Sequence, residues 1–146
     1  MANIVFQGPA ALTLDGKGRI AMPARHRELL TAMGVGQLTI TKQPGGSLLI
    51  FPRPAWEAFR DRVAALPMEA SGWKRVFLGN AMDVEMDGTG RILVSPELRA
   101  ATGITRETLL LGMGNHFELW DKATYEAKEA EATQGQMPDV FQDFAF

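Results

Sequence analysis

Two related units make up most of this sequence. The stretch DGKGRIAMPARHREL at 15–29 recurs as DGTGRILVSPELRAA at 87–101, an offset of 72 residues. A second block, LLIFPRPAWEAF at 48–59, recurs as FELWDKATYEAK at 117–128, an offset of 69 residues. The change of offset indicates a loop of different length between the two blocks. The sequence therefore predicts two copies of one unit of about 50 residues.

Each unit is expected to contain four short strands and a short helix, followed by a second helix. Asp-Gly pairs at 15–16 and 87–88 predict tight turns, because glycine accepts a positive φ at no steric cost. Pro23 suits the first turn of a helix that Gly34 would end. The expected strands are 11–14, 19–22, 37–42 and 47–51, then one ending at Met86, and 91–94, 107–112 and 116–120. The expected helices are 24–33, 55–65, a linking helix at 69–80, a short helix from Pro96, and 121–133.

A unit of this size buries too little apolar surface to be stable alone, so the two units are expected to share one core. A closed barrel built from both would also remove exposed strand edges. The predicted fold is mainly β with short helices (α+β), forming one pseudo-symmetric β-barrel. The expected divisions are a first repeat at 6–59, a helical linker at 60–80, a second repeat at 81–128 and an acidic C-terminal tail at 129–146.

Turn chemistry explains the repeated aspartates and glycines but not the repeated arginines. An arginine follows each aspartate by four residues, and another lies eight residues further on; the shared residues are Asp15, Arg19 and Arg27 in the first copy and Asp87, Arg91 and Arg99 in the second. An aspartate at this spacing is expected to hold the guanidinium group in one orientation. A fixed guanidinium group suits phosphate or guanine recognition. A plain turn with the arginine in solvent remains the alternative interpretation.

The first copy is the more basic of the two. Lys17 and Arg25 are replaced by Thr89 and Glu97 in the second copy. If one copy binds nucleic acid more strongly, the first is therefore expected to do so. For Arg25 and the neighbouring His26, a solvated helix face is the alternative interpretation.

The distribution of charge is more informative than the formal net charge of −2. Residues 118–146 carry seven acidic side chains and two lysines, whereas residues 1–117 carry thirteen basic and ten acidic side chains. The formal net charge thus combines an acidic C-terminal segment with a mildly basic remainder of the chain. The chain of 146 residues has no cysteine, which excludes disulfides and thiolate sites, and its apolar runs are too short to cross a bilayer.

Four stretches resemble the MraZ family of bacterial transcriptional regulators, relatives of AbrB-type DNA-binding domains. They are DGKGRIAMPARHREL, DGTGRILVSPEL, FLGNAMDVEMDGTGR and LLLGMGNHFELWD, and the similarity covers residues 6–130 and extends into the tail. The resemblance implies two tandem AbrB-like halves that form a swapped-hairpin barrel. It also implies a ring-shaped homo-oligomer.

The resemblance implies a regulator that binds double-stranded DNA at short G-rich direct repeats. These repeats lie upstream of a division and cell-wall gene cluster that contains the regulator's own gene, which it is expected to repress. The expected DNA-binding residues are Lys17, Arg19, Arg25, Arg27, Arg91 and Arg99, with Asp15 and Asp87 orienting them. Several subunits tethered in a ring would compensate for the few basic side chains of each. Such a protein is expected in the cytoplasm, associated with the nucleoid, with no membrane partner.

Other chemistry finds little support in the sequence. His26 and His116 lie far apart in a pattern unlike a metal site, and no serine sits in a nucleophile motif. We therefore expect no enzyme activity, no cofactor and no metal. The aromatic side chains Trp56, Phe59, Trp120 and Tyr125 are expected in the core or at subunit contacts. A structural or protein-interaction ring, with the arginines in subunit salt bridges, remains the alternative function.

Overall fold

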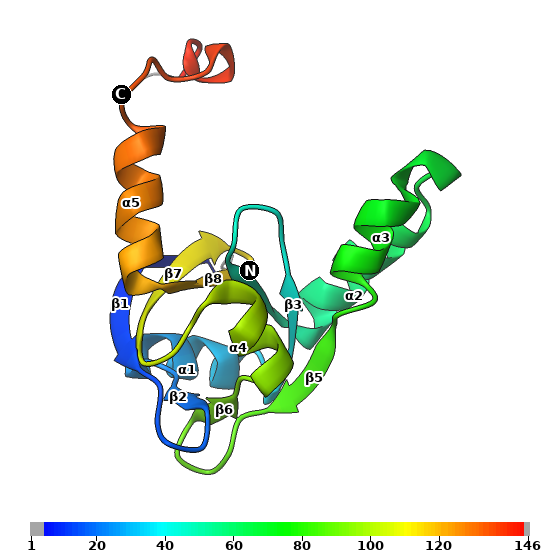
Figure 1. The fold of residues 1–146 in the computed structure, drawn as a ribbon. Coiled ribbons are helices and arrows are strands. Elements are labelled where there is room, and N and C mark those ends of the chain that lie inside the picture. Colours follow the sequence, from blue (N-terminus) through cyan, green and yellow to red (C-terminus); the bar gives the residue numbers. More distant parts are fainter. Residues whose placement is uncertain (1–4, 145–146) are drawn as a thin grey trace.

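A computed structural model of the chain describes residues 5–144. Its elements form two similar series (Figure 1). The first series is β1 (Phe6–Thr13), β2 (Arg19–Ala21), α1 (Ala24–Ala32), β3 (Gln37–Lys42), β4 (Leu48–Pro52) and α2 (Arg53–Ala64). The helices η1 (Met68–Ala70) and α3 (Ser71–Phe77) lead to the second series, which is β5 (Met82–Glu85), β6 (Arg91–Leu93), α4 (Pro96–Thr102), β7 (Glu107–Gly114), β8 (Phe117–Asp121) and α5 (Lys122–Ala132). The short helix η2 (Asp139–Phe141) follows in the tail.

Six strands form one antiparallel sheet in the order β1-β7-β8-β4-β3-β5. The order reads the same from both edges when each strand is exchanged for its counterpart in the other half: β1 for β5, β3 for β7 and β4 for β8. The first strand of each half pairs with the third strand of the other half, β1 with β7 and β5 with β3. The two halves are thus joined by strand pairing as well as by a common core.

The remaining strands, β2 and β6, form a separate two-stranded ladder in which Ile20 pairs with Ile92. Both isoleucines are fully buried. They join a core to which both halves contribute, including Phe6, Leu30, Leu38, Ile40, Leu48, Ile50, Leu98, Leu110, Phe117 and Leu119. The expected shared core is therefore present.

Most expected elements begin and end within two residues of their observed bounds, and the strand at 37–42 matches β3. There are two exceptions. The linking helix expected at 69–80 is instead η1 followed by α3, which ends at Phe77. The strand β1 begins at Phe6 and so contains Gly8 and Pro9. Proline removes a backbone donor, but β1 is an edge strand whose outer side needs no partner. The tolerance of an edge strand for proline explains the early start.

The expected α+β class, rich in strands, is confirmed. The large sheet is open, because β1 and β5 each have one strand neighbour among the described residues. The closed barrel and the swapped hairpin are therefore not confirmed. No helix within residues 5–144 has the length and apolar character needed to cross a membrane.

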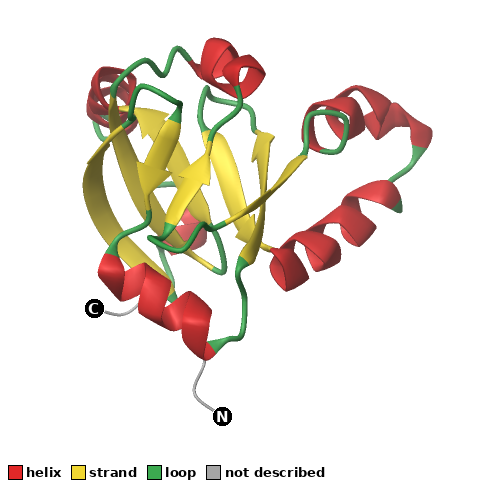
Figure 2. Cartoon of the chain, turned by 90° about the horizontal axis from the view of Figure 1, so that it is seen from below, coloured by secondary structure: helices red, strands yellow, loops and turns green. Residues whose placement is uncertain are grey.

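The helices surround the strands, as the view from below shows (Figure 2). Two groups of helices project from opposite sides of the molecule (Figure 1). The hairpin of α2 and α3 packs on β3, with α2 also against β4, whereas α5 contacts β7 and β8. The ladder of β2 and β6, with its two turns, lies apart from both groups (Figure 1).

Candidate functional site

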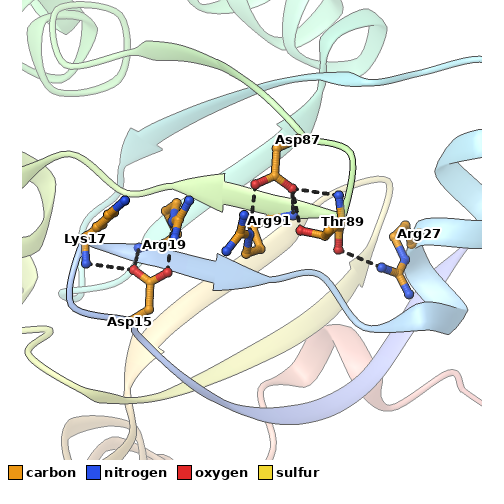
Figure 3. Close-up of polar contacts among 7 residues, drawn as sticks. All are labelled: Asp15, Lys17, Arg19, Arg27, Asp87, Thr89 and Arg91. Carbon is orange, nitrogen blue, oxygen red and sulfur yellow. Dashed lines mark hydrogen bonds and ion pairs between the residues drawn. The ribbon is translucent and has the colours of Figure 1, made fainter.

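The first Asp-Gly turn is built around the carboxylate of Asp15 (Figure 3). Its Oδ1 accepts hydrogen bonds from the backbone N–H groups of Lys17 and Arg19, each at 2.9 Å. Its Oδ2 accepts a hydrogen bond from Nε of Arg19, also at 2.9 Å. One oxygen therefore closes the turn, while the other holds the arginine side chain.

The second turn repeats this arrangement around Asp87 (Figure 3). Its Oδ1 accepts from the backbone N–H groups of Thr89 and Arg91 and from the Thr89 hydroxyl, each at 2.9 Å. Its Oδ2 accepts from Nε of Arg91 at 2.9 Å. The contact expected between aspartate and arginine is thus present in both turns.

Hydrogen bonds keep both carboxylates ionised. The backbone N–H of Arg19 contributes most to lowering the pKa of Asp15, and the Arg19 side chain and the Lys17 N–H add to it. The backbone N–H of Arg91 likewise contributes most to lowering the pKa of Asp87, followed by the groups of Thr89. The charged pairs therefore persist well below neutral pH.

The ladder of β2 and β6 has one buried and one outward face, because side chains alternate along a strand. Ile20 and Ile92 point into the core. The outward face carries Arg19, Ala21, Arg91 and Leu93, and the register places them in two adjacent rows. Among the hydrogen bonds of residues 5–144, both guanidinium groups donate through Nε only, so their terminal nitrogens are free for a ligand.

The arginines further along each repeat reach across to the other half. Arg27 donates from Nη1 to the carbonyl oxygen of Thr89 at 2.8 Å, and it packs against Gly90 (Figure 3). Arg99 donates from Nε to the carbonyl oxygen of Val94 at 3.0 Å, and it lies over Gly18. A Cβ added at Gly18 would lie 3.0 Å from Cζ of Arg99. These two arginines therefore contact the turns themselves.

Both glycines have a backbone that other residues rarely adopt. The φ angle is +82° at Gly18 and +80° at Gly90. Only glycine adopts this region without strain, and only a residue without a side chain leaves room for the arginine above it. Gly18 and Gly90 are thus needed for the turns and for the contacts that Arg99 and Arg27 make with them.

The two basic residues found only in the first copy lie in different settings. Lys17 is exposed at the tip of the first turn. Arg25 is exposed on α1 and donates from Nη2 to the carbonyl oxygen of Pro9 at 2.8 Å, so it is tied to strand β1. The structure therefore places Lys17 in the first turn, at one end of the β2–β6 ladder, and Arg25 beside the edge strand.

His26 does not lie on a solvated helix face. It is fully buried, with its ring edge-on to Phe6 and Phe117 at centroid distances of 5.9 and 4.9 Å. Neither ring nitrogen has a hydrogen-bond partner among the described residues. Burial, aided by the positive charge of Arg25, lowers its pKa below the usual value. At an offset of 72, His26 corresponds to the core residue Leu98, which is the sequence signal for its burial.

Sequence reasoning missed two members of the outward face, Ala21 and Leu93. Both are exposed, and the Leu93 side chain retains 47 % of its accessible surface. Alternation along each strand, with a buried isoleucine between two outward residues, is a signal that identifies them. Within residues 5–144, no group of three or more potential ligand side chains is placed to hold a metal ion.

Comparison with known proteins gives consistent matches along the chain. The family model described as "MraZ protein, putative antitoxin-like" matches residues 5–74 and 77–141. A "Transcriptional regulator MraZ" of Variovorax paradoxus (strain S110) is 78% identical over 142 residues, covering 97% of this chain and 100% of the relative. Proteins of the same name from Acidovorax sp. (strain JS42) and Methylibium petroleiphilum are 68% and 63% identical, over 97% and 100% of this chain and 100% of each relative.

Proposed function

Because the chain belongs to the MraZ family, we propose that it is a sequence-specific DNA-binding transcriptional regulator that contacts DNA through the outward face of the β2–β6 ladder. The observation that carries the proposal is the pair of Asp–Arg contacts on this face. Two guanidinium groups are oriented by carboxylates, and their terminal nitrogens are free among the described residues. The names of the relatives support a regulatory rather than an enzymatic role.

A two-stranded ribbon has the right size for the major groove of B-DNA. In that position Arg19 and Arg91 would each offer two parallel donors to O6 and N7 of a guanine. Asp15 and Asp87 would serve as positioning residues, because they fix each guanidinium group before DNA arrives. Leu93 would contact apolar base edges such as the thymine methyl group.

The other basic residues would act at the edges of this surface. Lys17 would contact a phosphate beside the first turn, and Arg25 and Arg27 would contact the backbone further along. Arg99 would do the same in the second half. Since Thr89 and Glu97 stand where the first half has Lys17 and Arg25, the first turn would supply the greater share of affinity.

The subunits would act together as a homo-oligomeric ring on short direct repeats. Repeats spaced about one helical turn, roughly 10 base pairs, would present the same groove face to successive subunits. Tethering would then raise the effective concentration of each subunit at its repeat, so that contacts that are weak individually give tight binding together. The proposed target is the promoter of the division and cell-wall gene cluster that contains its own gene, with repression as the outcome, in the cytoplasm and at the nucleoid.

The proposed fold has two halves that exchange their first strands. The halves at 6–59 and 81–128 would be AbrB-like repeats joined by the linker at 60–80, with the tail at 129–146 outside them. The exchange of β1 and β5 between the halves supports a swapped-hairpin arrangement. The β2–β6 ladder beside the large sheet would complete the barrel.

Fluorescence anisotropy with DNA from upstream of the gene cluster tests the proposal. Wild type, Arg19→Ala and Arg91→Ala are titrated at several salt concentrations, and light scattering checks the oligomeric state. Each lost base contact should cost about 1–3 kcal/mol per engaged subunit. Loss of the charge should also flatten the dependence of affinity on salt.

Arg60→Ala is the matched control, because Arg60 is an exposed arginine on α2 whose side-chain hydrogen bond and ion pair, among residues 5–144, are both with its neighbour Asp61. It should bind like wild type. A wild-type protein that binds native and scrambled repeats equally would overturn specific recognition. Failure to bind heparin as well would favour the structural ring, with the arginines engaged at subunit contacts.

A further inference from the structure

The outward face of the β2–β6 ladder has an approximate two-fold symmetry. Arg19 pairs with Leu93 across the ladder and Ala21 pairs with Arg91, and the buried isoleucine pair lies between them. Half a turn about this central pair exchanges each residue of β2 for its counterpart in β6. The repeat thus places one oriented arginine at each end of the face.

The residues that break this symmetry gather at one end. We define the Arg19 end as Lys17, Arg19 and Leu93, and the Arg91 end as their counterparts Thr89, Arg91 and Ala21. Figure 3 shows Lys17 beside Arg19 and Thr89 beside Arg91. Both larger side chains, the lysine and the leucine, belong to the Arg19 end. The two ends therefore offer a ligand different surfaces around the same arginine.

Leu93 adds apolar surface that the ladder does not need. Its side chain retains 47% of its accessible surface. The N–H of Val94 donates to the carbonyl oxygen of Gly18 at 2.8 Å, which joins this end of β6 to the first turn. Ala21 occupies the equivalent place in β2 with the same register, so alanine is sufficient for the ladder. The leucine is thus free to serve a contact outside the chain.

Leu93 also lies directly beside one of the two guanidinium groups. Residues paired across an antiparallel ladder have side chains in contact distance. The Arg19 side chain retains 26% of its accessible surface and the Arg91 side chain 39%, as expected where the neighbour across the ladder is leucine instead of alanine. A charged donor and an apolar side chain therefore stand side by side at the Arg19 end.

These two side chains suit two different bases of the major groove. Arginine matches O6 and N7 of guanine, and an apolar side chain matches the 5-methyl group, which thymine alone carries among the four bases. The Arg19 end is therefore suited to a guanine with a thymine next to it. At the Arg91 end, Ala21 is shorter and reaches less far from the ladder, so that end is suited to a guanine alone.

We propose that Leu93 is a specificity-determining residue that selects a thymine beside the guanine bound by Arg19, and that it thereby fixes the orientation of the chain on its repeat. A ladder with exact two-fold symmetry would bind equally well in both orientations. Unequal ends make one orientation the stronger. Subunits that all bind in one orientation match direct repeats, as two-fold related subunits match palindromes. The inference rests on the proposed function, because it requires the ladder to lie in the major groove.

Replacing thymine by uracil tests the base contact, because uracil lacks the 5-methyl group and keeps the hydrogen-bonding groups. Wild type and Leu93→Ala are titrated by fluorescence anisotropy against native repeats and against the same duplex with uracil for thymine. We expect uracil to weaken wild type about threefold to fivefold for each repeat engaged, and to leave the affinity of Leu93→Ala unchanged. Met82→Ala is the matched control, since Met82 is 45% exposed but lies on β5 in the large sheet, and it should respond to uracil as wild type does.

Tethered cleavage tests the orientation, because the chain has no cysteine of its own. Gly16→Cys and Gly88→Cys mark the two turns, since an added Cβ meets nothing within 4 Å at either glycine. Iron–EDTA attached to each cysteine should cut every repeat on one side from position 16 and on the other side from position 88. Uracil should weaken binding only when it replaces thymine on the side cut from position 16. The exchange variant Ala21→Leu/Leu93→Ala should move this sensitivity to the other side.

Two outcomes overturn the proposal. One is an equal loss of affinity on uracil by wild type and Leu93→Ala, which would mean that another residue reads the methyl group or that none does. The other is the same cutting pattern from both cysteines, which would mean that the chain binds in either orientation. If wild type still prefers native to scrambled repeats in these cases, the proposed function stands and this inference alone fails. Equal binding of native and scrambled repeats would instead overturn both.

Discussion

At the scale of single residues, Asp15 and Asp87 each combine two tasks in one carboxylate. One oxygen caps the turn through backbone N–H groups, and the other pairs with an arginine on the same strand. Most turn aspartates need only the first task. The second task gives the surface oriented donors instead of mobile ones.

Asp15→Asn separates the two tasks. The amide oxygen can still accept the backbone N–H groups of Lys17 and Arg19, so the turn should persist. The charged partner of the Arg19 side chain is lost, and its orientation with it. We expect DNA affinity to fall roughly threefold to tenfold while thermal unfolding changes little. An anisotropy titration equal to wild type would contradict a positioning role for Asp15.

His26 predicts a dependence of stability on pH. Burial lowers its pKa below 6.5, so below that pH the unfolded chain binds a proton that the folded chain does not. The free energy of unfolding should therefore fall as pH decreases from about 6.5. His26→Leu should reduce this decline and raise stability at pH 7 by about 1 kcal/mol, because two buried nitrogens without partners are removed.

Thermal unfolding followed by circular dichroism from pH 5 to 8 checks this prediction. His116 should retain part of the decline in the variant, since burial also lowers its pKa, although Glu118 opposes the shift. Leu98→Ala serves as a comparison, because it empties the corresponding position in the second half and should destabilise at every pH. A His26→Leu profile parallel to that of wild type would show that His26 has no part in the pH dependence.

The sequence predicted contacts at the residue scale where partners are close along the chain. The Asp–Arg pairs follow from a spacing of four residues within one turn. The contacts of Arg27 with Thr89 and of Arg99 with Gly18 were not predicted, because the partners lie in different halves of the chain. The alternative interpretation of a solvated helix face is wrong for His26: its basic neighbours suggested solvent, but its counterpart Leu98 is apolar and buried.

At the scale of elements, the two turns are held by glycines that serve both halves. Gly18→Ala should destabilise the fold by about 1–3 kcal/mol, since alanine is strained at a φ of +82° and its Cβ would press on Arg99. Gly16→Ala is the control in the same turn, because its φ is not positive and nothing lies within 4 Å of an added Cβ. Urea denaturation measures both, and equal midpoints would contradict the special role of Gly18.

Strands and helices were predictable in position but not in pairing. Alternation and turn residues located β3 and most other elements, because these signals are local. Alternation does not say which strands pair, so the exchange of β1 and β5 between halves required the structure. The early start of β1 was missed because Gly8 and Pro9 weaken a strand pattern except at an edge.

At the scale of the whole molecule, the internal repeat predicted the shared core. It did not predict whether the large sheet would be open or closed. The repeat is visible in the symmetric order of the strands. The offset between corresponding residues falls from 72 at the turns to 69 at β4 and β8. The halves differ most after their last shared helix. The first continues into α3, which packs against β3 and α2, and the second continues into a tail that is exposed throughout residues 133–144.

Removing the tail after Thr133 tests this division of roles. The deleted segment is acidic, and the described part of it has no buried residue, so neither the core nor the basic ladder depends on it. We therefore expect the truncated chain to keep its assembly mass in light scattering and its affinity for native repeats within about twofold. A loss of affinity at an unchanged assembly mass would mean that the tail reaches the DNA, whereas a loss of mass would mean that it holds neighbouring copies together.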